Sequence, residues 1–281
     1  MSSTPASQPS GTSPFLETAI RAVREAGALQ LEALGGALVV HKKGAIDLVT
    51  EVDLAIERRV RALLAERHPD HAVLGEEYGA PTDAAAAARA CWIFDPIDGT
   101  TNFAHGMPIF CASLALELEG RLAVAAVYDP TRDELFTAER GQGAWLNGQR
   151  LAVSGTERLS DALLVTGFPY TVQQDPADIL ELFGRFIGRT RAVRRLGSAA
   201  LDVCYVAAGR MDGFWEVGLG PWDIAAAALL VEEAGGRVTA MDGGPFVVRS
   251  GQLVATNGAV HDEMLAVIAE HRRDRSRNRT D

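Results

Sequence analysis

The feature that most constrains the fold is a short apolar run that ends in two carboxylates. Cys91-Trp92-Ile93-Phe94 reads as a buried strand, and Asp95-Pro96-Ile97-Asp98-Gly99-Thr100 follows it directly. Two aspartates three residues apart bring like charges together, and such crowding calls for a cation. Pro96 fixes its own φ and favours an extended Asp95, while Gly99 permits a sharp reversal. We therefore expect the acidic pair on a tight turn.

Oxygen ligands in octahedral geometry suit Mg²⁺, which usually binds to a few carboxylates and a substrate phosphate. Asp95 and Asp98 fit such a site, and the backbone carbonyl of Ile97 between them is a further oxygen ligand. The same residue types are common in surface β-turns. Composition alone leaves both a plain turn and a metal site open.

The run from Asp95 to Phe103 closely resembles the signature of the inositol monophosphatase family of Mg²⁺-dependent, lithium-sensitive phosphatases. The resemblance extends from about Phe15 to about Arg272. Further matches follow in the family's order: Gly75-Glu76-Glu77, Gly197-Ser198-Ala199-Ala200, Pro221-Trp222-Asp223 and Glu232-Glu233-Ala234-Gly235-Gly236. The resemblance implies an α/β fold of the αβαβα sandwich type and the hydrolysis of inositol 1-phosphate.

The resemblance also implies a set of metal ligands, with about two or three Mg²⁺ in each active site. Glu76, Asp95 and the Ile97 carbonyl would bind the first ion. Asp95 would bridge to a second ion, which Asp98 and Asp223 also hold. Paired metal ions activate a water and stabilise the leaving oxygen. Loss of the bridging Asp95 should therefore disable the chemistry.

The catalytic residues implied by the resemblance are Thr100, Asp47 and the metal ligand Glu76. The Thr100 hydroxyl, paired with Asp47, would orient and deprotonate the attacking water. A turn residue before the next helix is the alternative role for Asp47. Glu77 lies beside Glu76, but the family pattern assigns the metal to the first of the two.

Contacts to the substrate are predicted from several segments. The backbone N–H groups of Gly99 and Thr100 are candidates for phosphate oxygens if a helix begins there. Glu216 matches the family's contact to the inositol ring, whereas Arg194 and Arg195 either steer the phosphate or simply flank a strand. The predicted substrate-binding residues are Asp98, Gly99, Thr100, Gly197, Ala199, Glu216 and Asp223.

The identity of the substrate is less constrained than the metal chemistry. Thr101-Asn102-Phe103 resembles the inositol monophosphatase branch, and Thr166-Gly167-Phe168-Pro169 resembles its bacterial members. Related enzymes that act on fructose 1,6-bisphosphate or histidinol phosphate remain alternatives. An interaction protein on a phosphatase scaffold is an alternative of a different class, because the basic run from His271 to Arg279 is typical of tails that bind nucleic acid or acidic partners.

Composition restricts the partners and the compartment. The formal net charge of −10 argues against nucleic-acid binding by the folded body. No apolar run approaches the roughly 20 residues of a membrane span, and no signal-peptide pattern opens the chain. Cys91, Cys111 and Cys204 cannot all pair within one chain and have apolar neighbours, so we expect buried thiols. We expect a cytoplasmic protein, and the resemblance implies a homodimer.

The chain divides into two structured halves between polar ends. Residues 1–13 are rich in Ser, Thr and Pro, and residues 272–281 are strongly basic, so both segments are predicted to be disordered. Residues 14–155 form the half that carries the metal-binding loop, and residues 156–271 form the second half. No internal repeat divides them further.

Hydrophobic periodicity predicts the elements of each half. In the first half, helices begin at Pro14 and near Thr50, and strand-like runs between Phe110 and Ala138 indicate an antiparallel meander. In the second half, strand-like and helical segments alternate from Leu163 to His271. This alternation predicts a layered architecture whose second half is more parallel.

Overall fold

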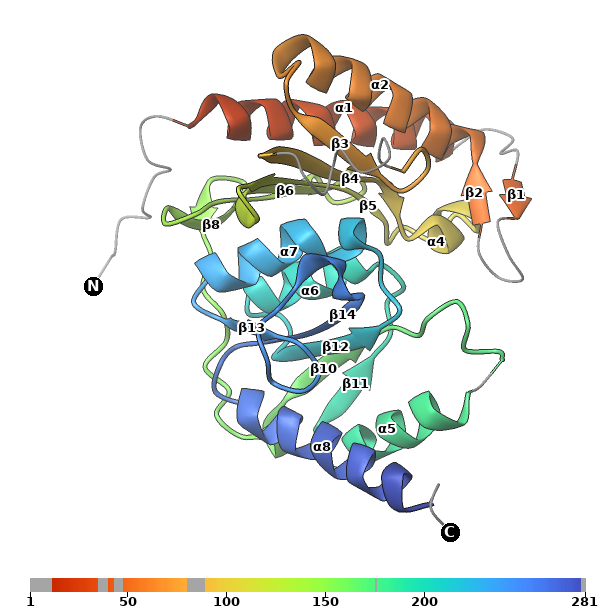
Figure 1. The fold of residues 1–281 in the computed structure, drawn as a ribbon, viewed down its shortest axis with the longest axis vertical. Coiled ribbons are helices and arrows are strands. Elements are labelled where there is room, and N and C mark those ends of the chain that lie inside the picture. The colour runs from red at the N-terminus through yellow and green to blue at the C-terminus, as the bar shows by residue number, and fades with distance from the viewer. Residues whose placement is uncertain (1–11, 35–39, 43–47, 80–88, 175, 279–281) are drawn as a thin grey trace.

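The computed structural model describes residues 12–34, 40–42, 48–79, 89–174 and 176–278. Helices and sheets alternate in layers from one end of the molecule to the other (Figure 1). The outer helices are α1 (Pro14–Leu34) and α2 (Glu51–Arg67) at one end and α5 (Ala177–Ile187) and α8 (His261–Asn278) at the other. Between the two sheets lie α6 (Ala199–Ala207) and α7 (Pro221–Glu233). The predicted αβαβα sandwich is confirmed.

The first sheet has seven strands in sequential order from β3 to β9. Its strands are β3 (Ala72–Gly75), β4 (Ala90–Asp98), β5 (Cys111–Leu118), β6 (Arg121–Asp129), β7 (Glu134–Glu139), β8 (Gly143–Leu146) and β9 (Gln149–Arg150). β3 and β4 are parallel, and every later neighbour is antiparallel. The predicted meander is confirmed. Beside this sheet, β1 (Val40–Lys42) and β2 (Leu48–Thr50) form a separate antiparallel pair, and α4 (Thr100–Ala104) follows β4.

The second sheet has the strand order β11-β10-β12-β14-β13. Its strands are β10 (Leu163–Thr166), β11 (Ala192–Arg194), β12 (Gly213–Val217), β13 (Arg237–Thr239) and β14 (Gln252–Thr256), with short 3₁₀ turns η1 (Leu159–Asp161) and η2 (Val248–Ser250) beside them. β10 is parallel to β11 and β12, whereas β14 is antiparallel to β12 and β13. This sheet is therefore the more parallel of the two, although it is mixed.

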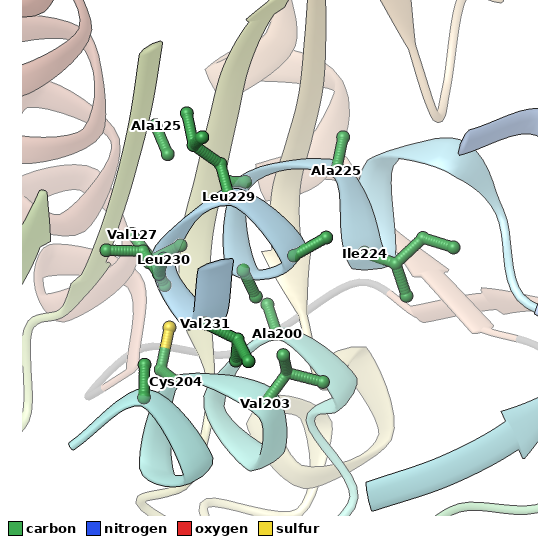
Figure 2. Close-up of a cluster of buried hydrophobic side chains, with 14 of the residues drawn as sticks. Ala125, Val127, Ala200, Val203, Cys204, Ile224, Ala225, Leu229, Leu230 and Val231 are labelled. Atoms are coloured by element: carbon green, nitrogen blue, oxygen red, sulfur yellow. The ribbon is translucent and has the colours of Figure 1, made fainter. Parts of the chain in front are cut away.

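The helices between the sheets are almost entirely apolar in their buried turns, apart from Asp202 of α6, because both sheets cover them. Every residue of α7 from Ile224 to Val231 is buried, and α6 is buried from Ala200 to Ala207. Figure 2 shows how Leu229 and Leu230 of α7 lie close to β6. A helix that is hydrophobic all round is typical of a buried layer. This packing fixes the N-terminal ends of both helices, which carry residues of the site described below.

Helix α1 supports the acidic signature from behind the first sheet. A Cβ on Gly27 would lie 2.5 Å from Cδ1 of Tyr128, so glycine permits close packing of the helix on the sheet. Leu31 is 45% exposed although it is apolar. Gln30 takes the buried position, and its Nε2 donates a 2.7 Å hydrogen bond to the carbonyl of Pro96.

The expected disorder from residue 272 differs from the structure, because α8 continues through Asn278. Ion pairs hold this end of the helix against α5: Arg275 contacts Asp178, and Asp274 lies 2.7 Å from Arg185. Composition alone does not reveal these tertiary partners. Residues 1–11 and 279–281 lie outside the described residues. Among the described helices, none combines the length and the apolar character that a membrane span requires.

Candidate functional site

The acidic pair lies at the end of a strand rather than on a tight turn, so that prediction was wrong. β4 continues through Asp98, and its register with β5 shifts between Asp95 and Asp98. Asp95 pairs with Ser113 and Asp98 pairs with Cys111, so β4 has one extra residue there. In a regular strand, positions three apart face opposite sides. The irregularity allows both carboxylates to reach one site.

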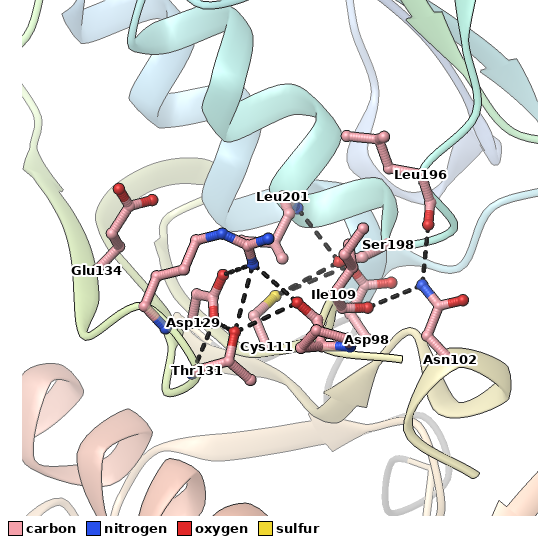
Figure 3. Close-up of polar contacts among 12 residues, drawn as sticks. Asp98, Asn102, Ile109, Cys111, Asp129, Thr131, Glu134, Leu196, Ser198 and Leu201 are labelled. Carbon is pink, nitrogen blue, oxygen red and sulfur yellow. Dashed lines mark hydrogen bonds and ion pairs between the residues drawn. The ribbon is translucent and has the colours of Figure 1, made fainter. Parts of the chain in front are cut away.

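The chain reverses its direction one residue after Asp98, at Gly99. This residue has φ 98°, and a Cβ on it would lie 2.9 Å from the carbonyl oxygen of Ile109. Helix α4 begins there as predicted, but it has only five residues, so its dipole is small. Asn102 in α4 donates 2.8 Å hydrogen bonds to the carbonyls of Ile109 and Leu196 (Figure 3). These bonds join the signature to the segment at Gly197.

Asp98 binds the N-terminus of helix α6. It accepts hydrogen bonds from Ser198 Oγ at 2.5 Å, from the Ala199 N–H at 3.2 Å and from the Ala200 N–H at 2.7 Å. Burial raises the pKa of Asp98, while these donors oppose the rise. The N–H of Ala199, predicted to contact substrate, is thus already engaged by a carboxylate.

Asp223 lies in the first turn of helix α7. Its Oδ2 accepts a 2.7 Å hydrogen bond from the Gly220 N–H, and Pro221 occupies the first helical turn. Proline and an acidic residue both favour a helix start. Helix α7 accordingly begins at Pro221. Burial raises the pKa of Asp223 well above its usual value, and the charges of Asp98 and Glu76 add to this rise.

Three carboxylates converge from separate elements. Asp95, Asp98 and Asp223 each offer an oxygen, and these oxygens lie within 4.8 Å of one another. Burial raises the pKa of Asp95 well above its usual value, and the nearby Glu76 is the next largest cause. Buried like charges and an oxygen-only donor set fit a hard divalent cation such as Mg²⁺.

The other predicted ligands lie close to this cluster. Glu76 is outside the tight group of three, but its charge acts on both Asp95 and Asp223. The Ile97 carbonyl accepts a 2.9 Å hydrogen bond from Thr100 Oγ1. A carbonyl oxygen has two lone pairs, so this contact leaves it able to bind an ion.

The Thr100 hydroxyl has an aspartate partner in the described residues. Its Oγ1 lies 3.5 Å from Oδ1 of Asp53, a long contact from the buried side of α2. Asp47, the predicted partner, lies outside the described residues. The strand that follows it, β2, contacts α4. The assignment of Asp47 therefore stays a prediction.

A cavity of about 230 Å³ lies beside the carboxylates. Most of the residues predicted to bind substrate line it, whereas the buried Thr100 does not. The predicted residues in its lining are Asp98, Gly99, Gly197, Ala199, Glu216 and Asp223. Burial raises the pKa of Glu216 to about 8, against the opposing effects of Arg195 and the Gly167 N–H.

Sequence reasoning missed two residues that line this cavity and two buried acidic residues on α2. The sequence did not decide whether Arg195 steers the phosphate or only flanks a strand. In the structure it lines the cavity, and its guanidinium lies 5.0 Å from the ring centroid of Phe168. Asp202, on α6, is buried, and its Oδ1 has no hydrogen-bond partner among the described residues. Asp53 and Glu57 are buried on α2 at the spacing of its apolar face. Charged residues at core spacing were the available signal.

Comparison with known proteins assigns the chain to a family. The model of the inositol monophosphatase family matches residues 12–276. The chain belongs to the inositol monophosphatase family. The family and its solved structures support a phosphatase, and Mg²⁺ dependence is general in the family.

Relatives and solved structures in this family span almost the whole chain. Nus factor SuhB of Pseudomonas aeruginosa is 47% identical over 262 residues, covering 92% of this chain and 97% of that protein. The inositol monophosphatase of Anabaena is 40% identical, with a TM-score of 0.83, covering 91% of this chain and 95% of that structure. SaIMPase-II with inositol monophosphate bound is 27% identical, with a TM-score of 0.79 and coverage of 94% and 97%.

Proposed function

We propose that this chain hydrolyses inositol 1-phosphate to inositol and phosphate with the help of Mg²⁺. The observation that carries the proposal is the convergence of Asp95, Asp98 and Asp223 beside a cavity of about 230 Å³. This volume suits a small substrate, because sites for drug-sized ligands occupy roughly 300–1,000 Å³. A related structure described as holding inositol monophosphate supports the choice of substrate.

The residues proposed to hold Mg²⁺ are Glu76, Asp95, Asp98, Asp223 and the carbonyl of Ile97. When bound, the metal supplies water activation and charge stabilisation of the leaving oxygen. All of these ligands offer oxygen, which suits this ion.

The other residues of the site position the substrate and the attacking water. Burial raises the pKa of Glu216 to about 8 in the metal-free protein, and its carboxyl group is proposed to hydrogen-bond a ring hydroxyl. Thr100 and Asp47 are proposed to orient the water, with Asp53 as a further acceptor for the Thr100 hydroxyl. Arg195 lines the cavity and supplies a positive charge for the phosphate.

A panel of substrates tests this proposal. Phosphate release with Mg²⁺ should be fastest from inositol 1-phosphate, compared with fructose 1,6-bisphosphate, histidinol phosphate and 3′-phosphoadenosine 5′-phosphate. Preference for another compound would be consistent with the proposed metal chemistry but would refute inositol 1-phosphate as the ligand of the cavity. Absence of turnover on every compound would contradict the enzymatic proposal.

We also propose that the protein is a cytoplasmic homodimer, as is usual in the family. Light scattering at micromolar concentration should give twice the chain mass of 29.9 kDa. A mass of one chain would contradict this proposal.

We propose a partner-binding role as a second candidate, because a relative with 47% identity carries the name Nus factor SuhB. Arg272 and Arg273 are both exposed near the end of α8. Reversing both charges spares Asp274 and Arg275, which pair with α5. The double variant should keep full turnover but lose binding of a fluorescent RNA, measured by anisotropy. Equal RNA binding by both proteins would argue against this role for α8.

A further inference from the structure

Two charged side chains on α2 hold the loop that carries Glu76. Glu57 and Arg61 are one helical turn apart, and their side chains pair at 2.8 Å. The Glu57 side chain is 0% exposed and that of Arg61 is 24% exposed. A buried carboxylate requires partners that compensate the loss of solvation. Besides Arg61, the partners of Glu57 are on the loop after β3.

Glu57 accepts hydrogen bonds from two successive backbone groups of this loop. Its Oε2 accepts from the Glu77 N–H at 2.8 Å, and its Oε1 accepts from the Tyr78 N–H at 3.2 Å. Space for the carboxylate depends on Gly75, because a Cβ there would lie 2.0 Å from Glu57 Oε1. Glu76 lies between this glycine and the bonded amides.

Arg61 binds the backbone on both sides of Glu76, in β3 and at the end of the loop. Its Nη1 donates to the Val73 carbonyl at 3.2 Å, and its Nη2 donates to the Gly79 carbonyl at 2.5 Å. The Gly79 carbonyl also accepts from the Gly75 N–H at 3.2 Å, which closes the loop on itself. The pair therefore fixes the backbone before and after Glu76.

The other side of the loop is held against the acidic strand. The Glu76 N–H donates a 3.2 Å hydrogen bond to the carbonyl of Phe94, the residue before Asp95. The Glu76 charge in turn raises the pKa of Asp95. Movement of this loop would thus change the distance between the Glu76 carboxylate and the three clustered carboxylates.

We propose that Glu57 and Arg61 are positioning residues that place Glu76 for metal binding and so set the affinity of the site for Mg²⁺. The inference rests on the proposed function, in which Glu76 is a metal ligand. Groups that orient a metal ligand typically contribute about 10–100-fold to metal affinity or activity. Neither residue touches substrate in this scheme.

Glu57→Gln and Arg61→Lys test the proposal. In Glu57→Gln the new amide group must face a backbone N–H, so one of the two loop bonds is lost. In Arg61→Lys the charge remains, but one ammonium cannot reach both Val73 and Gly79. Arg58→Lys is the matched control, because Arg58 is exposed on the same helix and its guanidinium bonds only the Leu54 carbonyl among the described residues.

The readout is Mg²⁺ binding by calorimetry on the purified proteins, beside the Mg²⁺ dependence of phosphate release. We expect the dissociation constant for Mg²⁺ to rise about 10–100-fold in both variants and to stay unchanged in Arg58→Lys. Saturating Mg²⁺ should restore kcat to near the wild-type value. A purely structural role would lower the melting temperature without such rescue.

Unchanged Mg²⁺ affinity in a folded variant would overturn the proposal. If Glu57→Gln does not fold, Arg61→Lys decides the question, because it retains the charge that Glu57 requires. The binding measurement is separate from the proposed activity. Wild-type protein that binds Mg²⁺ but does not hydrolyse inositol 1-phosphate would refute the function and leave the positioning role to be judged by affinity alone.

Discussion

Replacing Glu216 with glutamine should stabilise the metal-free protein at alkaline pH. The Glu216 side chain lies on β12 in the lining of the substrate cavity and is 7% exposed. Burial is the main cause that raises its pKa from 4.5 to about 8, and the Asp98 charge adds to the rise. Glutamine has nearly the same shape and cannot ionise, so the substitution isolates the cost of ionisation.

The sign of the effect follows from proton binding. Between pH 4.5 and about 8, native Glu216 keeps a proton that the unfolded chain releases. Stability contributed by this group is therefore present below pH 4.5 and is lost as the pH rises through this window. Each pKa unit is about 1.36 kcal/mol, so the loss reaches at most about 4 kcal/mol by pH 8. The advantage of Glu216→Gln should grow by up to about 3 kcal/mol between pH 5 and pH 8.

Urea unfolding in EDTA measures this difference at pH 5, 6, 7 and 8. Glu66→Gln serves as the control, because Glu66 is exposed on α2. The free energy of unfolding of Glu216→Gln should exceed that of the wild type increasingly with pH, while the control difference stays flat. A constant or shrinking difference would refute the argument that Glu216 is protonated in the native protein near neutrality.

Three further predictions concern the metal site and a buried histidine. Asp95→Asn should lower turnover by orders of magnitude, because an amide is a poorer bridging ligand than a carboxylate. It should also stabilise the metal-free protein against urea, because it removes one of the crowded like charges. Near-normal turnover would contradict the ligand assignment. Lithium should inhibit by competing with Mg²⁺ where Asp98 and Asp223 converge, and full activity at high lithium with limiting Mg²⁺ would argue against this. His261 is 0% exposed, bonds Thr239 and Thr256, and has its pKa lowered by burial to about 4. Its contribution to stability should be present above pH 6.5 and be lost by up to about 3 kcal/mol as the pH falls towards 4, and the loss should be smaller in His261→Gln.

The elements of this fold were predictable because their signals are local. Apolar spacing in α1 and α2 and the period-two runs of β5 to β7 are properties of short segments. The tight turn at Asp95 failed as a prediction because the chain there remains paired with β5. Whether a Pro-Gly segment turns or bulges depends on the register of its neighbour, which the local sequence does not contain.

The candidate site was predictable in its residue types more than in its contacts. The hydrogen bonds from Ser198 and Ala200 to Asp98 join segments about a hundred residues apart, and nothing local predicts them. Glu57 was within reach of sequence reasoning, because it lies between Ile56 and Val60 on the apolar face of a helix. A charge at core spacing indicates a buried network with a specific role.

The architecture also explains how the fold tolerates three crowded carboxylates. Asp98 accepts hydrogen bonds from the N-terminus of α6, and Asp223 lies in the first turn of α7. Each helix start carries a partial positive charge of about half an elementary charge. Because the core packing brings both helix starts to the end of β4, the protein offsets part of the repulsion before any ion binds. The remaining repulsion among the carboxylates favours binding of a divalent cation. Substitutions that loosen the packing of α6 and α7 should therefore weaken metal binding even when they do not change a ligand.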